Sequence, residues 1–148
     1  MDCIFEVEIQ NNQLKRTSMQ RNKLSYNGQK IFIGIDVHKN LWGVAVVCEG
    51  GFEDYHTQEP SAEKLFEFLQ KHYPDGEYHA VYESGFSGFS TYYSLVELGI
   101  DCMVINAADV PTTQYEHTMK TDQIDARKLA RSLKSGLLRG IYIHSKEN

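Results

Sequence analysis

Four acidic residues stand where their carboxylates could meet in one site. Asp36 ends a short run of β-branched residues, and Glu83 ends a later apolar run just before Ser84-Gly85. Asp122 and Asp125 open a predicted helix three residues apart, so their Cβ atoms lie on one face at roughly 5–6 Å. Neighbouring carboxylates repel one another unless cations neutralise them. Hard oxygen ligands suit Mg²⁺ or Mn²⁺, so the pattern predicts a divalent metal site.

The chemistry available to such a site is phosphodiester exchange. Two divalent ions about 3.5–4 Å apart stabilise the attacking and leaving oxygens of an in-line displacement. Each acid taken alone also has a simpler interpretation. An acid in the first turn of a helix suits the helix dipole, and an acid at a strand end can be merely solvated. The metal interpretation depends on all four acids coming together.

The elements that must position these acids form an alternating pattern. Ser61 caps a helix whose apolar residues, Leu65 and Leu69 among them, fall on one face. The order βββαβαβα predicts an α/β fold, with a mixed sheet flanked by helices. The other predicted helices cover 87–98 and about 121–135. The predicted strands are 31–36, 41–48, 52–57, 78–82 and 101–105, with a short β-like piece at 141–143.

The 148 residues suffice for one domain, predicted at 29–146 after a flexible leader at 1–28. Met19 is an alternative start of translation within that leader. The net charge of −5 argues against a domain that binds mainly by neutralising many phosphates. No apolar run has the length of a membrane span. The three cysteines are widely spaced, so they predict reduced thiols in a cytoplasmic protein, with Cys48 and Cys102 buried.

Three segments resemble the N-terminal domain of DEDD transposases from bacterial insertion sequences of the 110 type. They are 33–39 (I-G-I-D-V-H-K), 82–85 (Y-E-S-G) and 120–130 (K-T-D-Q-I-D-A-R-K-L-A). The resemblance covers about residues 31–145 and implies a RuvC-like RNase H fold. Residues that match the four acids of the family, and so would be both catalytic and metal-binding, are Asp36, Glu83, Asp122 and Asp125.

The resemblance also implies function and partners. DNA would be the substrate, Mg²⁺ or Mn²⁺ the cofactor, and an element-encoded RNA the guide for donor and target DNA. Full-length members are expected to form homo-oligomers and to carry a second, C-terminal domain with a catalytic serine. The chain ends at Asn148, about where the segment leading to that domain should begin. The sequence therefore predicts a transposase domain that processes DNA strands with metal but is incomplete by itself.

Basic residues near the acids could bind the nucleic-acid backbone. A solvated helix surface is the alternative interpretation for those on the last helix. The predicted nucleic-acid-binding residues are Lys39, Lys120, Arg127, Lys128 and Arg131. His38, two residues after Asp36, could reach a phosphate or be a solvated loop histidine.

Other functions have weaker sequence support. A nucleic-acid-binding or assembly module without strand cleavage is the alternative, and salt-dependent RNA binding without nuclease activity would favour it. An actin-like ATPase fragment shares the I-G-I-D start, but no second phosphate loop follows. Ser84, Ser87 and Ser90 do not fit the G-x-S-x-G spacing of a nucleophilic serine.

Overall fold

The computed structural model describes residues 25–85, 88–106 and 122–143, and within the last helix it describes side chains from Ala126 onward. Five strands form one mixed sheet in the order β3-β2-β1-β4-β5. β1, β2 and β3 are antiparallel neighbours, whereas β4 and β5 run parallel to β1. The strands are β1 (Lys30–Val37), β2 (Trp42–Cys48), β3 (Glu53–Gln58), β4 (Glu77–Glu83) and β5 (Asp101–Ile105).

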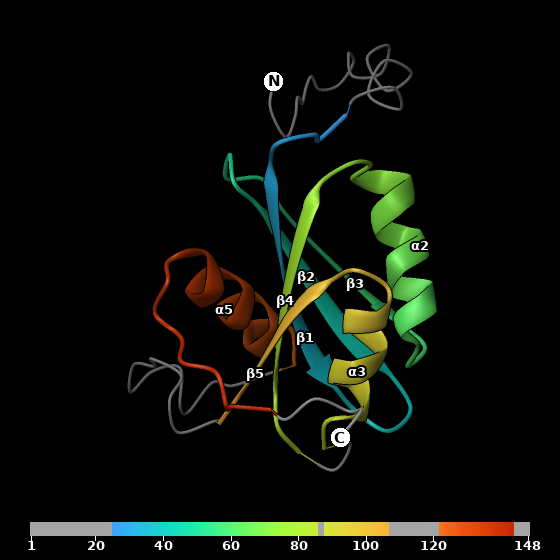
Figure 1. Cartoon of the computed structure of the whole chain (residues 1–148), viewed down its shortest axis with the longest axis vertical. Helices are drawn as coiled ribbons and strands as arrows, with labels where there is room; N and C mark the ends of the chain where they lie inside the picture. Colours follow the sequence, from blue (N-terminus) through green and yellow to red (C-terminus); the bar gives the residue numbers. More distant parts are fainter. Residues whose placement is uncertain (1–24, 86–87, 107–121, 144–148) are drawn as a thin grey trace.

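Helices cover both faces of this sheet. α2 (Ala62–His72) and α3 (Ser90–Glu97) pack on one face, and α5 (Asp122–Lys134) packs on the other (Figure 1). The element order along the described residues is the predicted βββαβαβα. The Ser61 hydroxyl accepts the Lys64 N–H at 3.1 Å, which confirms the predicted cap of α2.

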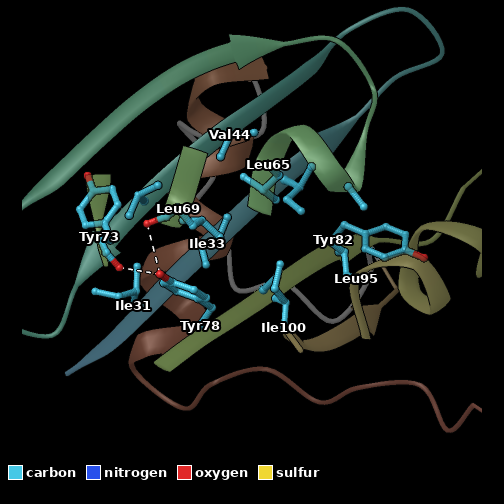
Figure 2. Packing of buried hydrophobic residues seen from close by; sticks show 14 of the residues in the cluster. Ile31, Ile33, Val44, Leu65, Leu69, Tyr73, Tyr78, Tyr82, Leu95 and Ile100 are labelled. Carbon is cyan, nitrogen blue, oxygen red and sulfur yellow. Dashed lines mark hydrogen bonds between the residues drawn. The ribbon is translucent and has the colours of Figure 1, made fainter. Parts of the chain in front are cut away.

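The larger core lies between the sheet and the helices α2 and α3 (Figure 2). Alternate residues of β1 and β4 point into it, and Leu65 and Leu69 of α2 meet them with no exposed surface. The Tyr78 hydroxyl donates to the backbone carbonyls of Tyr73 at 2.6 Å and Leu69 at 3.2 Å. These bonds join the end of α2 to β4, and they add to the bonds that the same carbonyls accept from the Gly76 and Tyr73 N–H groups.

The opposite face of the sheet packs against α5 at very close range. A Cβ atom added at Gly34 would lie 2.1 Å from the Ala126 carbonyl oxygen and 2.7 Å from the Ala130 nitrogen. Glycine is therefore required in the middle of β1, because the helix backbone rests directly on the strand. Small residues on α5 make the same approach possible from the other side.

Two sequence expectations differ from the observed fold. Residues 141–143 form no strand; the Ile141 N–H bonds to the Val104 carbonyl at 2.7 Å beside β5. The predicted leader, 1–28, lies outside the described residues up to position 24, but it included Tyr26, which is buried in the core. Tyr26 packs on the Tyr73 ring with centroids 5.3 Å apart, and its N–H bonds to the Pro74 carbonyl.

The remaining sequence expectations concern the thiols and the membrane. Cys48 is buried and Cys102 half-buried, and both are free thiols. Burial raises the pKa of Cys102 to about 12, and the nearby Asp101 acts in the same direction, so its thiol is protonated at neutral pH. None of the described helices is long and apolar enough to cross a bilayer.

Candidate active site at the ends of β1 and β4

Asp36 and Glu83 lie side by side on neighbouring parallel strands. Ile35 of β1 is the register partner of Tyr82 of β4, and each acid directly follows its strand's member of that pair. Adjacent strands lie about 4.8 Å apart. Because Ile35 and Tyr82 point into the α2/α3 core, alternation turns both acids toward the α5 face. The register thus brings together two of the four predicted ligands.

The direction of α5 follows from its contacts with the sheet. Gly34 and Tyr55 lie in one row of register partners across β1, β2 and β3. The next row on the same face of the sheet, two residues further from Asp36 along the strands, contains Glu53. Arg127 lies over the Tyr55 ring at 5.5 Å, whereas Arg131, one turn later, bonds to Glu53. The helix therefore runs away from the Asp36 row as its residue numbers increase.

The N-terminal turn of α5 consequently lies toward the carboxyl ends of β1 and β4. One turn back from Ala126, which rests on Gly34, is about 6 Å along the helix axis. One row of the sheet, from Gly34 to Asp36, is about 6.7 Å. The backbone of Asp122–Asp125 is thus directed toward the row of Asp36. The side chains of Asp122 and Asp125 lie outside the described side chains.

The surroundings of Asp36 suit a metal ligand. Its side chain is only 15% exposed, and its Oδ2 atom lies 3.2 Å from Nε2 of His38. A largely buried carboxylate is costly unless it is paired or coordinates a cation. Carboxylate oxygens are the ligands that Mg²⁺ and Mn²⁺ prefer, so the donor chemistry fits such an ion. Among the described side chains alone, no three acids, histidines or cysteines are grouped as a metal site.

Tyr82 holds the chain rigid where it leaves the site. Its side chain is fully buried, and its hydroxyl donates to the Gly88 carbonyl at 2.8 Å and accepts the Tyr92 N–H at 3.1 Å. Burial raises the pKa of this hydroxyl, so it stays protonated. The Ser84 N–H also bonds to the Ile105 carbonyl of β5. The backbone on either side of Glu83 is therefore fixed.

The predicted nucleic-acid-binding residues have different surroundings. Arg131 is bound to Glu53 through two hydrogen bonds, of 2.6 and 2.9 Å, and these bonds lower the pKa of Glu53 despite its partial burial. Arg127 stacks on Tyr55, 3.6 Å from a Glu53 oxygen. Both arginines thus brace α5 against β3. Lys39 is exposed beside the site, Lys128 is half-buried, and Lys120 lies outside the described residues.

Sequence reasoning missed the structural role of Gly34. A glycine inside a β-branched strand usually marks a close approach of another backbone, and that signal was present in I-G-I-D. The brace from Glu53 to Arg131 spans 78 residues and leaves no local signal.

Comparison with known proteins first defines the class of fold. A structure of RuvC from Thermus thermophilus superposes with a TM-score of 0.52 at 12% identity, covering 75% of this chain and 99% of that one. With the mixed five-stranded sheet, this shows an α/β, RNase H-like fold of the RuvC type.

The particular family follows from the sequence. Residues 33–148 match the model of the DEDD transposase family of IS110 elements, described as transposase. The transposase for insertion sequence element IS1533 of Leptospira borgpetersenii is 31% identical over 112 residues, 72% of this chain and 32% of that protein. A putative transposase of Sinorhizobium fredii, y4rJ, is 25% identical over 70% of this chain and 29% of its own length. This chain belongs to the IS110-type DEDD transposase family, and it spans about a third of the length of these relatives.

Proposed function

We propose that this chain supplies the metal-dependent strand-processing site of a DNA transposase. Asp36, Glu83, Asp122 and Asp125 would bind one or two Mg²⁺ or Mn²⁺ ions. The observation that carries the proposal is the shared row of Asp36 and Glu83, which faces the sheet side on which the N-terminal turn of α5 arrives. Family membership supports the assignment of all four acids.

The residues of the chain would hold the ions and orient the DNA. When bound, the ions would stabilise the charge on the attacking and leaving oxygens of the phosphodiester. Asp36 is largely buried, and hydrogen bonds of Tyr82 and Ser84 hold the chain on either side of Glu83, so the chain at both acids is already in place. Lys39 and the cations of α5 that Glu53 does not neutralise would contact the DNA backbone.

The wider setting follows from the family. The proposed substrate is DNA in the bacterial cytoplasm, with an element-encoded guide RNA and a homo-oligomeric assembly as partners. A chain with about a third of the length of its relatives would contribute only one part of the reaction. We therefore expect metal binding from this chain alone and strand exchange only with the remaining part of a full-length transposase.

Isothermal titration calorimetry with Mg²⁺ and Mn²⁺ tests the metal site. Wild type should bind the ions, and Asp36→Asn and Glu83→Gln should each weaken binding at least about tenfold. Even the loss of a group that only hydrogen-bonds to a metal ligand typically costs roughly 10- to 100-fold in metal affinity. Asp54→Asn is the control, because Asp54 is an exposed acid on β3. No heat of binding in wild type, or binding unchanged in Asp36→Asn, would rule out the site.

Nucleic-acid binding separates this function from its alternative. The proposed function predicts that bound Mg²⁺ strengthens the binding of a DNA oligonucleotide and that Asp36→Asn removes this effect. Salt-dependent RNA or DNA binding that ignores both metal and Asp36 would instead support a binding or assembly module.

A further inference from the structure

A cavity of about 300 Å³ opens next to the proposed metal site, on the α2/α3 side of the sheet. It starts at Val37, the residue after Asp36, and includes the turn that leads into β2. Trp42 and Pro60 contribute apolar wall, and the remaining lining is largely polar. A cavity of this size is in the lower range of sites for small ligands.

The N-terminal ends of two helices meet at this cavity. Ser61 caps α2, and Ser90 and Thr91 are the first two residues of α3; all three line the cavity. Helix N-termini carry partial positive charge and open N–H groups, which favour anions. The Ser61 hydroxyl accepts the Lys64 N–H of α2, and the Tyr82 hydroxyl accepts the Tyr92 N–H of α3, whereas Phe89, the residue before α3, adds no side-chain cap. The two dipoles together favour a negatively charged group.

Thr91 is a second and independent indication of a ligand. The residue is only 8% exposed, it lines the cavity, and its hydroxyl has no hydrogen-bond partner among the described residues. A polar side chain that is this largely enclosed is normally hydrogen-bonded. A bound oxygen acceptor in the cavity would satisfy this one. Ser94, three residues after Thr91 in α3, also lines the cavity and adds a second hydroxyl.

The charges at the rim are of both signs. Lys39 lines the cavity from the turn after β1 and is exposed, so it can close over an anion. Glu63 opposes an anion, and the Ser61 hydroxyl lies 3.4 Å from its carboxylate oxygen. Removing the charge of Glu63 should therefore strengthen anion binding, and this gives the sign of the ligand charge a direct test.

We propose that this cavity binds a phosphate group of the nucleic-acid backbone, with Thr91, Ser94 and Lys39 as its side-chain contacts. The inference rests on the proposed function, since a strand processed at Asp36 would pass over the end of β1 beside the cavity. A phosphate held there would fix the register of the strand relative to the metal site. The phosphate site itself requires neither metal nor Asp36.

Amide NMR of the full chain, titrated with inorganic phosphate and with a single-stranded DNA oligonucleotide, tests this site. Both ligands should shift the amides of residues 61–63 and 90–94. Thr91→Val removes the hydroxyl at constant shape and should weaken phosphate binding about tenfold, as expected for one hydrogen bond to a charged group. Lys39→Gln should also weaken it, and Glu63→Gln should strengthen it. Ser135→Ala, which removes a hydroxyl in the turn directly after α5, should change nothing.

Several results would overturn the proposal. Amide shifts that do not map to the cavity would contradict a phosphate site. So would a phosphate affinity of Thr91→Val and Lys39→Gln that equals that of wild type. Weaker phosphate binding in Glu63→Gln would also contradict it, because removing a negative charge at the rim of an anion site should strengthen binding. Inorganic phosphate that binds while the oligonucleotide leaves the cavity unshifted would identify a site for free phosphate only. Asp36→Asn separates the two proposals, because it should weaken metal binding while leaving phosphate binding at the cavity intact.

Discussion

Replacing Gly34 with alanine should damage both stability and metal binding. The new methyl group would lie 2.1 Å from the Ala126 carbonyl oxygen and 3.0 Å from the Leu129 Cβ. Nonbonded heavy atoms prefer roughly 3.5–4.0 Å, so α5 would have to move by at least about 1 Å. Its neighbours are backbone atoms, so no side-chain rotation can relieve the contact.

The expected cost can be bounded. Overpacking of a core typically costs about 1–3 kcal/mol, and a backbone clash belongs at the upper end. Loss of backbone freedom in the unfolded chain offsets only about 0.4–1 kcal/mol of this. We therefore expect Gly34→Ala to lose about 2 kcal/mol net, which lowers the Tm by roughly 4–8 °C in a domain of this size.

Urea unfolding and Mg²⁺ calorimetry on the same variant measure the two effects. Metal ligands must keep their distances within about 0.2 Å, so a displaced α5 should weaken Mg²⁺ binding even in the fully folded variant. Gly85→Ala is the control, because a Cβ atom there would meet nothing closer than the Glu83 carbonyl oxygen at 4.0 Å. If Gly34→Ala is as stable as Gly85→Ala, the close packing of α5 on β1 is refuted.

Two further predictions concern the contacts that position the helices. Glu53→Gln should lower stability at pH 7 by about 1 kcal/mol, since the double hydrogen bond to Arg131 is partly exposed. Because the folded-state pKa of Glu53 is lowered from 4.5, its contribution to stability is present above pH 4.5 and disappears as the pH falls through the folded pKa. The urea midpoints of wild type and Glu53→Gln, measured against pH, should therefore converge at low pH. Tyr78→Phe should cost about 1–3 kcal/mol in thermal unfolding, because the carbonyls of Leu69 and Tyr73 lose a buried donor (Figure 2).

Matched controls distinguish these effects from general surface changes. Glu59→Gln removes an exposed carboxylate 3.9 Å from Lys64 and should change stability by less than about 0.5 kcal/mol. Tyr92→Phe removes a hydroxyl that has no hydrogen bond among the described residues, and it should be nearly neutral. If either control matches its test variant, the assigned contact is not the cause of the loss.

Local patterns were sufficient to predict most of the fold. The Ser61 cap, the β-branched run before Asp36 and the alternating elements gave the order and the class of the sheet, which the RuvC-like structure confirms. The boundaries moved by up to three residues, because the ends of strands and helices depend on partners that the sequence alone does not show. Tyr26 lay in a polar stretch, and its burial depends on Tyr73, 47 residues later.

The candidate site was less predictable. Four acids could be chosen from the sequence, and the register of β1 with β4 explains why Asp36 and Glu83 become neighbours. The arginines of α5 were predicted to bind nucleic acid, but Glu53 on β3 engages Arg131 and lies close to Arg127. A long-range pairing of this kind cannot be found from residue types. The cavity at α3 depends likewise on how two helix ends meet.

The most direct test of the central claim is to locate a bound Mn²⁺ ion by NMR. A small amount of Mn²⁺ broadens the amide signals of residues close to it. A metal ion held by the four acids should selectively broaden the signals of Asp36, Glu83 and residues 122–125, and this broadening should be lost in Asp36→Asn. Broadening centred on other acids, such as Glu77 and Asp101, or a pattern unchanged in Asp36→Asn, would contradict this metal site.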